Sequence, residues 1–175
     1  MSVPDLWTVA PEDFDSPGAA MLWRAYYTEV SDRWYLLREG RATDRAELER
    51  AIAAATGAEF APPRGVLLVA RYAGEPVGTA GVHLLDDATA ELGRVFVLAD
   101  MRGKGGAALL VAAAEQQARI LGADKIVLDT RLDLVEARAL YARLGYEEST
   151  PHNNEMYAEC WYSKKLQQRA RSCLH

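Results

Sequence analysis

A glycine-rich turn with two basic residues is the strongest chemical signal in the sequence. It consists of Arg102, Gly103, Lys104, Gly105, Gly106 and Ala107. We expect this turn between a strand and a helix, where glycines let backbone N–H groups approach an anion and the helix N-terminus adds its dipole. Arg102 and Lys104 add positive charge. The turn therefore predicts a site for a phosphate or a pyrophosphate.

Three classes of phosphate ligand could use such a turn. A nucleotide P-loop requires Gly-Lys followed by Ser or Thr, and here Gly105 follows Lys104. A dinucleotide motif is matched by Gly103, Gly105 and Ala108, with Asp129 as the acidic residue further on. That motif normally follows the first strand of a sheet, whereas we expect three antiparallel strands before this turn. The context therefore disfavours a dinucleotide and leaves coenzyme A as the third class.

The case for coenzyme A comes from a resemblance. Residues 91–97, followed by Arg102-x-x-Gly105-x-Ala107, resemble the cofactor motif of the GNAT superfamily of N-acetyltransferases, Gln/Arg-x-x-Gly-x-Gly/Ala. Residues 136–146 resemble the second motif of that superfamily. The resemblance covers residues 66–166 well and the N-terminal helices only in outline. One departure is Leu134, which stands where many members have an Asn near the cofactor.

This resemblance implies acetyl-CoA as co-substrate and no metal. Backbone N–H groups of residues 102–107 would hold the pyrophosphate. Backbone groups around Phe96 and Val97 would hold the pantetheine arm and the acyl carbonyl, between strands that splay apart. The alternative for Gly103, Gly105 and Gly106 is a tight strand-to-helix turn without a ligand.

Tyr141 and Glu91 are the candidate catalytic residues. The phenol of Tyr141 could protonate the departing thiolate, although Tyr141 also falls on an apolar helical stripe and could be plain core. Glu91 matches the position of the base in the histone-acetylating branch of the superfamily and could deprotonate the incoming ammonium. Its alternative is a surface carboxylate. His83 and His152 are expected to be structural or solvent-facing, and a Cys–His nucleophile using Cys160 is disfavoured.

The resemblance places the acceptor between the N-terminal helices and the last two strands. Aromatic and polar residues are available there: Tyr26, Tyr27, Arg33, Trp34, Tyr157 and Trp161. The aromatic rings could enclose a cation or fill the core. We expect a small-molecule or protein amine as acceptor. The alternative is a non-catalytic acyl-CoA sensor or interaction module on the same fold, since fold does not fix function.

Periodicity and turn residues predict the elements that must position these residues. The expected strands are residues 7–10, 66–72, 77–85, 89–98, 125–129, 146–148 and 158–166. The expected helices run from Ser16 to Gly40, from a capping box at 44–47 to Gly57, over 102–121, and from a capping box at 133–136 to Leu144. The pattern predicts an α/β (α+β) fold, and the resemblance implies that this fold is GNAT-like. Its mixed, mainly antiparallel sheet has six to seven strands, one β–α–β crossover and about four helices.

Composition bounds the remaining expectations. The 175 residues, half of them hydrophobic, predict one domain over residues 1–166 and a frayed tail over 167–175. The net charge of −5 comes from scattered charges, which argues against a nucleic-acid partner. We find no transmembrane segment and no signal peptide, so no membrane partner is expected, and Cys160 and Cys173 are expected to be free thiols in the cytoplasm. Association into a homodimer stays open.

Overall fold

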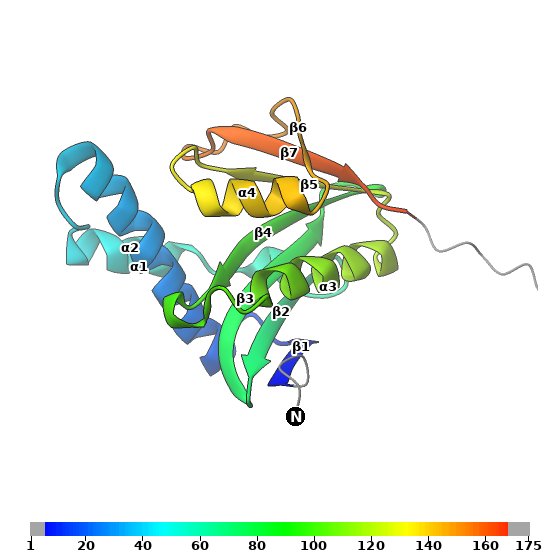
Figure 1. Ribbon diagram of the computed structural model, residues 1–175, viewed down its shortest axis with the longest axis horizontal. Helices are drawn as coiled ribbons and strands as arrows, with labels where there is room; N and C mark the ends of the chain where they lie inside the picture. Colours follow the sequence, from blue (N-terminus) through cyan, green and yellow to red (C-terminus); the bar gives the residue numbers. More distant parts are fainter. Residues whose placement is uncertain (1–5, 168–175) are drawn as a thin grey trace, which may run out of the picture.

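The first half of the sheet is an antiparallel meander. Strand β2 (Gly65–Tyr72) pairs with β1 (Trp7–Pro11) on one side and β3 (Glu75–Leu84) on the other, and β3 pairs with β4 (Thr89–Val97). The computed structural model describes residues 6–167, so all of the predicted frayed tail at 167–175 except Gln167 lies outside the described part. The Gln167 carbonyl accepts a hydrogen bond from Arg119 at 2.9 Å. Figure 1 shows the meander from blue through green.

A single crossover completes the sheet. Helix α3 (Gly106–Ile120) leads to β5 (Lys125–Thr130), which runs parallel to β4. After α4 (Val135–Arg143), β6 (Glu147–Glu148) and β7 (Cys160–Lys165) add antiparallel pairs. The described residues thus form one seven-stranded sheet in the order β1-β2-β3-β4-β5-β7-β6. The predicted fold class is confirmed, and the strand bounds differ from the expectation by one or two residues.

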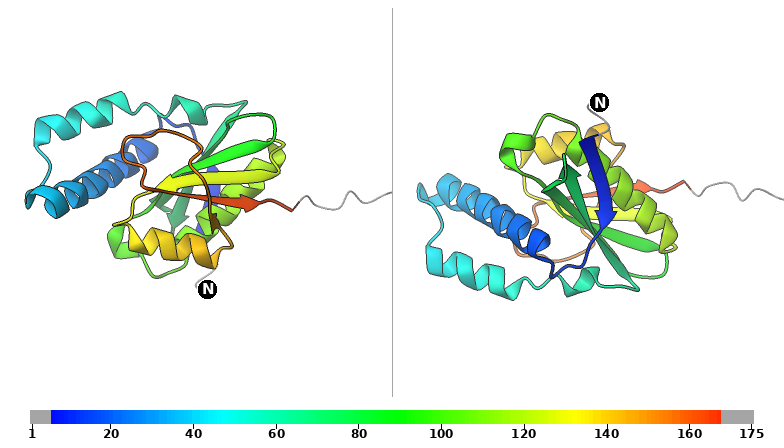
Figure 2. Two further views of the ribbon diagram at one scale, coloured as in Figure 1. Left: turned by 90° about the horizontal axis from the view of Figure 1, so that it is seen from above. Right: turned by 90° about the horizontal axis from the view of Figure 1, so that it is seen from below.

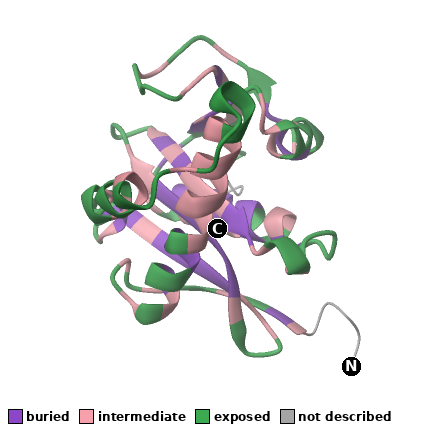
Figure 3. Cartoon of the chain, turned by 90° about the vertical axis from the view of Figure 1, so that its left-hand side faces the viewer, coloured by how far each residue is buried: buried purple, intermediate pink, exposed green. Residues whose placement is uncertain are grey.

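The helices lie on opposite faces of the sheet, as the two views of Figure 2 show. Helices α3 and α4 cover one face, where Leu92, Ile126 and Leu128 form part of the main core. Helices α1 (Pro17–Glu39) and α2 (Arg45–Ala54) lie on the other side, where Trp23 packs with Phe60 in a smaller core. Figure 3 shows the buried strands between these layers. No described helix is both long enough and apolar enough to cross a membrane.

The helix ends predicted at Ser16, Gly40 and Asp44 are confirmed, whereas those predicted at Gly57, Arg102 and the 133–136 capping box are wrong. Helix α2 ends at Ala54 and not at Gly57. Ser16 caps α1, whose end is closed by Gly40 in a left-handed conformation, and Asp44 caps α2 by accepting a hydrogen bond from the Glu47 N–H. Helix α3 begins at Gly106 and not at 102, because residues before it form an open turn. Helix α4 has no side-chain cap, so the predicted capping box at 133–136 is wrong.

The failed cap has a clear cause. The carboxylate of Asp133 makes a two-fold hydrogen bond to the guanidinium of Arg131, with both distances 2.9 Å. This charged partner outcompetes the backbone N–H groups at the start of α4. This ion pair therefore stabilises the loop between β5 and α4.

Strand β4 contains a bulge next to the site. The register with β3 shifts between Thr79 and Gly81, and Arg94 adopts a φ of +52°. The hydroxyl of Thr79 donates to the carbonyl of Arg94 at 2.9 Å, which replaces a ladder bond lost at the bulge. The bulge bends β4 away from β5, so the two strands part beyond Glu91.

Candidate functional site

A cleft opens where the two parallel strands separate. Strands β4 and β5 pair at three positions, ending at Glu91 and Val127, although β4 continues to Val97. The cleft has a volume of about 580 Å³ and is lined by α1, the end of β4, the glycine-rich turn and α4. Phe96, Val97 and most of the predicted cofactor residues line it. The structure therefore brings the predicted cofactor residues together at one opening in the sheet.

The glycine-rich turn leaves several backbone donors without protein acceptors. Gly103 and Gly105 have φ values of +81° and +84°, and the first helical bond of α3 runs from the Leu109 N–H to the Gly105 carbonyl. The N–H groups of residues 103–108 accordingly have no carbonyl partner among the described residues. A Cβ atom at Gly103 or Gly105 would meet nothing within 4 Å. Open space and convergent donors at a helix N-terminus fit a phosphate group.

Gly106 is needed for a different reason. A Cβ atom at this position would lie 2.3 Å from the ring of Trp7, on β1. Its lack of a side chain lets the start of α3 pack directly on the edge of the sheet. Gly106 therefore serves packing as well as offering its N–H group.

The two cations of the turn differ from expectation. The guanidinium of Arg102 donates to both carboxylate oxygens of Glu29 on α1, at 2.7 and 2.8 Å, and to the Val97 carbonyl at 2.9 Å. Its charge is thus neutralised, and the side chain holds the turn against α1. The ammonium of Lys104 lies 5.0 Å from the centre of the Tyr72 ring. Backbone donors, more than these side chains, are left to receive an anion.

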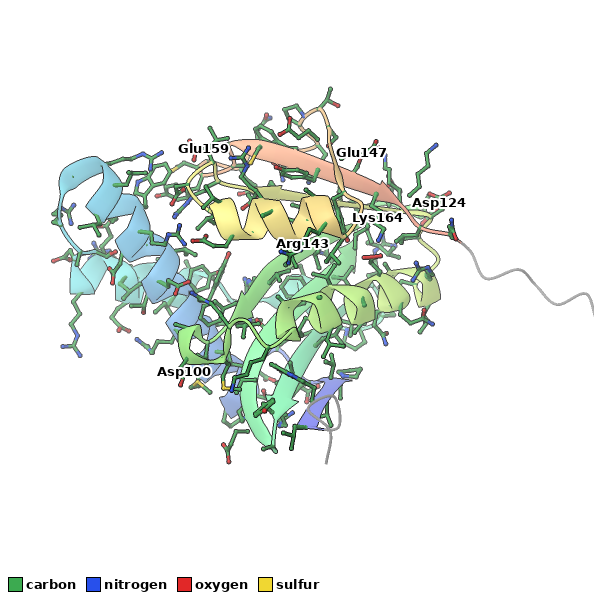
Figure 4. The ribbon with its side chains drawn as sticks, in the orientation of Figure 1. Asp100, Asp124, Arg143, Glu147, Glu159 and Lys164 are labelled. Carbon is green, nitrogen blue, oxygen red and sulfur yellow. The ribbon has the colours of Figure 1, made fainter. Side chains whose placement is uncertain are left out.

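A cation that the sequence reading did not single out also borders the cleft. Arg143 lies near the end of α4, is exposed and lines the cofactor cleft. Figure 4 labels it on the side of α4 that faces α3. No carboxylate lies within ion-pair distance of Arg143 among residues 6–167. The second motif had shown Arg143 only as part of a helix.

Tyr141 combines a core ring with a cleft-lining position. Its ring packs against Tyr146 and Tyr162, with centroids 5.6 and 6.2 Å away, and Tyr141 also lines the cofactor cleft. Burial, and then the nearby Tyr26 phenol and Asp129 carboxylate, raise the pKa of Tyr141 well above its usual value. The phenol is therefore protonated at neutral pH and can donate a proton. The two interpretations of Tyr141, acid and core, are compatible in this geometry.

A second cavity adjoins the cofactor cleft. It has a volume of about 480 Å³ and shares Tyr26, Val30 and Leu134 with the cleft. Of the residues predicted for the acceptor side, four line this second cavity: Tyr26, Tyr27, Trp34 and Tyr157. Arg33 lines the cofactor cleft instead, where it donates to the Asp133 carbonyl at 2.8 Å. We call this second space the acceptor cavity, because it meets the cleft at the predicted reaction centre.

Glu91 lines the acceptor cavity and is held by a network of polar side chains. Its Oε2 atom lies 2.7 Å from the Nε2 of His152 and accepts from the Asn153 amide at 3.3 Å. The same amide donates to Asp129 at 2.8 Å. His83, opposite Glu91 in the sheet, lies 3.8 Å from Oε1. Glu91 is 22% exposed, so it is a wall residue and not a surface carboxylate.

The orientation of Asn153 follows from Trp161. The indole N–H of Trp161 donates to Asn153 Oδ1 at 3.0 Å, and an indole can only donate. The Asn153 oxygen must therefore face Trp161, and its amino group must face the two carboxylates. Trp161 was predicted to border the acceptor, and it acts on the cavity through Asn153.

The carboxylates and histidine of this network are close enough to bind a cation. One ligand atom each from Glu91, Asp129 and His152 lies within 4.8 Å of the others. The Asn153 amino group, however, already donates to both carboxylates. A metal at this point would have to displace these hydrogen bonds, so the donor set fits a hydrogen-bonded network better than a metal centre.

Sequence reasoning missed Asp129, His152 and Asn153 as members of one site. They lie on β5 and in the loop before β7, far from Glu91 in sequence. Asp129 was noted only for its spacing from the glycines, and His152 as a loop residue. Cys160 is buried, its thiol donates to the Thr130 carbonyl, and burial raises its pKa, so no Cys–His nucleophile forms with His152.

Comparisons with known proteins agree with this geometry. The model of the acetyltransferase (GNAT) family matches residues 21–146. An uncharacterized N-acetyltransferase of Escherichia coli, YjgM, is 37% identical over 91 residues, which are 50% of this chain and 54% of that protein. The chain spans about half the length of the curated relatives it matches.

Solved structures show the same fold. An N-acetyltransferase from Thermoplasma acidophilum in complex with coenzyme A is 12% identical, with a TM-score of 0.68 over 91% of this chain and 98% of that one. A GNAT family acetyltransferase from Elizabethkingia anophelis with acetyl-CoA bound is 18% identical, with a TM-score of 0.59 over 93% and 99%. At such identities the likeness concerns the fold alone.

Proposed function

Because the chain belongs to the GNAT acetyltransferase family, we propose that it transfers an acetyl group from acetyl-CoA to a primary amine. The amine attacks directly while both substrates are bound. The observation that carries the proposal is the meeting of two cavities: a cleft with unpartnered backbone donors adjoins a cavity with carboxylates in its wall. We also propose that residues 1–166 form one domain, because its described part shares one sheet.

The residues of the cleft would bind and orient the co-substrate. Acetyl-CoA supplies an acetyl group activated as a thioester. Backbone N–H groups of residues 103–108 would receive the pyrophosphate, and Arg143 would add a free cation. Backbone groups of Phe96 and Val97, freed from pairing with β5, would hold the pantetheine arm. Leu134 lines both cavities and offers an apolar contact where many relatives have a polar one.

The remaining residues would move protons. Glu91 takes a proton from the incoming ammonium, directly or through water, so that the amine nitrogen carries a lone pair. The carbon–nitrogen bond forms, the carbon–sulfur bond breaks, and Tyr141 gives its proton to the departing thiolate. The second proton that the nitrogen loses restores the Tyr141 hydroxyl, directly or through water, and Glu91 releases its proton to solvent. The Tyr141 hydroxyl is protonated at neutral pH, as an ordinary phenol is, and burial raises its pKa further. The products are an amide and the free thiol.

The acceptor cavity separates this proposal from its alternative. A non-catalytic acyl-CoA sensor needs no room for an acceptor beside the thioester, whereas about 480 Å³ is available here next to the cleft. Of the two candidate proton-transfer residues, Tyr141 lines the cleft and Glu91 lines the acceptor cavity. These observations favour the enzyme.

A ligand screen tests the proposal. We expect acetyl-CoA and coenzyme A to raise the melting temperature and NAD and ATP to leave it unchanged, because a ligand that binds the folded state stabilises it. A panel of amines with acetyl-CoA should release free thiol with at least one acceptor. Stabilisation by NAD without any stabilisation by acetyl-CoA would refute the assignment. Binding of acetyl-CoA without acceptor-dependent thiol release across the panel would favour the sensor.

A further inference from the structure

The wall of the acceptor cavity carries more carboxylates than cations. Its described lining includes five carboxylates and two guanidinium groups: Glu47, Glu59, Glu91, Asp129 and Glu155, with Arg94 and Arg131. The lining also includes five aromatic side chains, those of Tyr26, Tyr27, Trp34, Tyr35 and Tyr157. An excess of one charge in a concave site raises the local concentration of ligands of the opposite charge.

Both arginines of the wall are largely buried and have protein partners, although one guanidinium nitrogen of Arg94, the buried Nη1, has no hydrogen-bond acceptor. Arg131 makes its two-fold hydrogen bond to Asp133, donates to the Val30 carbonyl at 2.8 Å, and its side chain is 9% exposed. Arg94 lies 3.5 Å from Glu59 and 4.1 Å from the centre of the Trp23 ring, with 11% of its side chain exposed. These pairings leave four carboxylates of the wall without a cationic partner from Arg94 or Arg131.

Three of those four carboxylates, Glu47, Glu91 and Asp129, have uncharged donors or histidines beside them. Glu91 and Asp129 share the amide of Asn153, and His83 and His152 flank Glu91. Glu47 accepts a hydrogen bond from the Tyr35 hydroxyl. Glu155 has no side-chain partner among the described residues. The guanidinium groups just outside the cavity are engaged as well, since Arg38 pairs with Glu159 and Arg41 with Glu39.

The carboxylates lie at two ends of the cavity. Glu91 and Asp129 project from β4 and β5, next to the cleft where the acetyl group would arrive. Glu47 belongs to the first turn of α2, which Figure 1 shows at the outer edge of the molecule, away from those strands. Tyr26, Tyr27 and Trp34 line the wall between, on α1. Aromatic walls suit both methylene chains and cations.

We propose that the acceptor is an aliphatic diamine or polyamine. This inference rests on the proposed acetyl transfer. The amino group that reacts lies beside Glu91 and Asp129, whose contacts with the Asn153 amide stay in place, and the methylene chain contacts the rings of α1. A second ammonium group lies at Glu47, and Glu155 adds a further carboxylate to the same wall. An amino acid would place its carboxylate among carboxylates, and a simple alkylamine would leave the outer end unpaired.

Matched acceptors test the charge at the outer end. Butylamine, putrescine and spermidine share a primary amine on an alkyl chain, while butylamine lacks a second cation. We expect kcat/KM for putrescine or spermidine to exceed that for butylamine about 10- to 100-fold, the size of one charge-assisted contact. The advantage should shrink with added salt, because salt screens partly exposed charges. Glutamate should be the poorest acceptor.

Variants locate the contact. Glu47→Gln and Glu155→Gln should each lower the putrescine-to-butylamine ratio of kcat/KM about threefold to tenfold. Glu49→Gln is the control, since Glu49 lies on the same helix but pairs with Arg24 at 2.6 Å and does not line the cavity. Glu49→Gln should leave the ratio unchanged. Circular dichroism of each variant checks that it is folded.

The outcomes separate this inference from the proposed function. Thiol release that is faster with butylamine or glutamate than with the polyamines would overturn the inference and leave acetyl transfer intact. The inference also fails if Glu47→Gln and Glu155→Gln both keep the wild-type ratio. No release with any amine, while acetyl-CoA still binds, overturns the polyamine assignment and favours the sensor. Loss of acetyl-CoA binding itself would refute the proposed function.

Discussion

The cofactor cleft and the acceptor cavity share three wall residues but are built in opposite ways. The anion-binding end of the cleft comes from one continuous run, residues 103–108, and offers backbone N–H groups. The acceptor cavity is lined by side chains from α1, α2, β4, β5 and the loop before β7. The ligand of the cleft should therefore depend on backbone shape, and the ligand of the cavity on individual side chains.

This contrast extends to the charged groups. In the cleft, the guanidinium of Arg102 is paired with the carboxylate of Glu29. The backbone N–H groups of the glycine-rich turn are therefore the main groups that could attract an anion. In the cavity, the side chain of Glu91 lies 2.7 Å from the His152 ring, and Asp129 accepts a hydrogen bond from the Asn153 amide. Substitutions that add a side chain should harm the first region most, and substitutions that remove a functional group should harm the second.

Tyr141→Phe should have the largest effect, because Tyr141 lines the cofactor cleft and is the proposed proton donor to the thiolate. The change removes one hydroxyl and keeps the ring, so kcat should fall about 10²–10⁴-fold if the hydroxyl protonates the thiolate. Acetyl-CoA affinity should change little. Tyr162→Phe is the matched control, since its ring contacts Tyr141 but lines neither cavity. Steady-state kinetics measure the effect. If Tyr141→Phe keeps the wild-type kcat while the chemical step limits the rate, Tyr141 is a core residue and not the acid.

Gly105→Glu should weaken acetyl-CoA binding by about 10²–10³-fold, since it places a like charge and bulk where the pyrophosphate would lie. Gly105→Ala is the control. Both variants share the strain of a side chain at a φ of +84°, but the alanine methyl would meet nothing within 4 Å. Calorimetric titration compares the two. Equal acetyl-CoA affinity in Gly105→Glu and the wild type would mean that the glycine-rich turn does not bind the pyrophosphate.

Glu91→Gln should lower kcat/KM about 10- to 100-fold near neutral pH and less at high pH, where more acceptor amine is already neutral. Asp129→Asn is the matching variant, because it tests whether Asp129 rather than Glu91 is the base. Both carboxylates contact the Asn153 amide, but Glu91 alone of the two lies beside a histidine at 2.7 Å. A larger loss in Asp129→Asn, with pH relief, would move the base from Glu91 to Asp129.

Tyr26 gives the smallest expected effect and concerns stability. Burial, followed by the charge of Tyr27, raises the pKa of Tyr26 from 10.0 to about 12. Between these values the unfolded chain loses the phenol proton and the folded chain keeps it, so the free energy of unfolding should fall by about 1 kcal/mol per pH unit. Below pH 10 this contribution is fully present. Urea titrations across this range should show a shallower fall in Tyr26→Phe, and an unchanged slope would contradict the shift.

The sequence by itself determined the fold and the cofactor side of the site. Strand alternation, the Ser16 and Gly40 caps and the run of glycines are local signals, and local signals can be read without knowing the rest of the chain. The start of α3 was misplaced because glycines with positive φ interrupt a helical pattern without changing its apolar spacing. The capping box at Asp133 was wrongly predicted because the Asp133 carboxylate accepts hydrogen bonds from the Arg131 guanidinium and not from the backbone of α4.

Only the tertiary structure decided the acceptor side. Asn153, Asp129 and Glu91 come from three segments that meet because β5 pairs with β4 on one side and β7 on the other. The spacing of these residues in the sequence does not predict their contact. The same holds for the ion pair of Arg102 with Glu29, since these two residues lie far apart in the sequence. A site made of backbone N–H groups comes from one continuous segment, so its residues can be recognised in the sequence. A site made of side chains from several segments forms only when the sheet brings distant residues together.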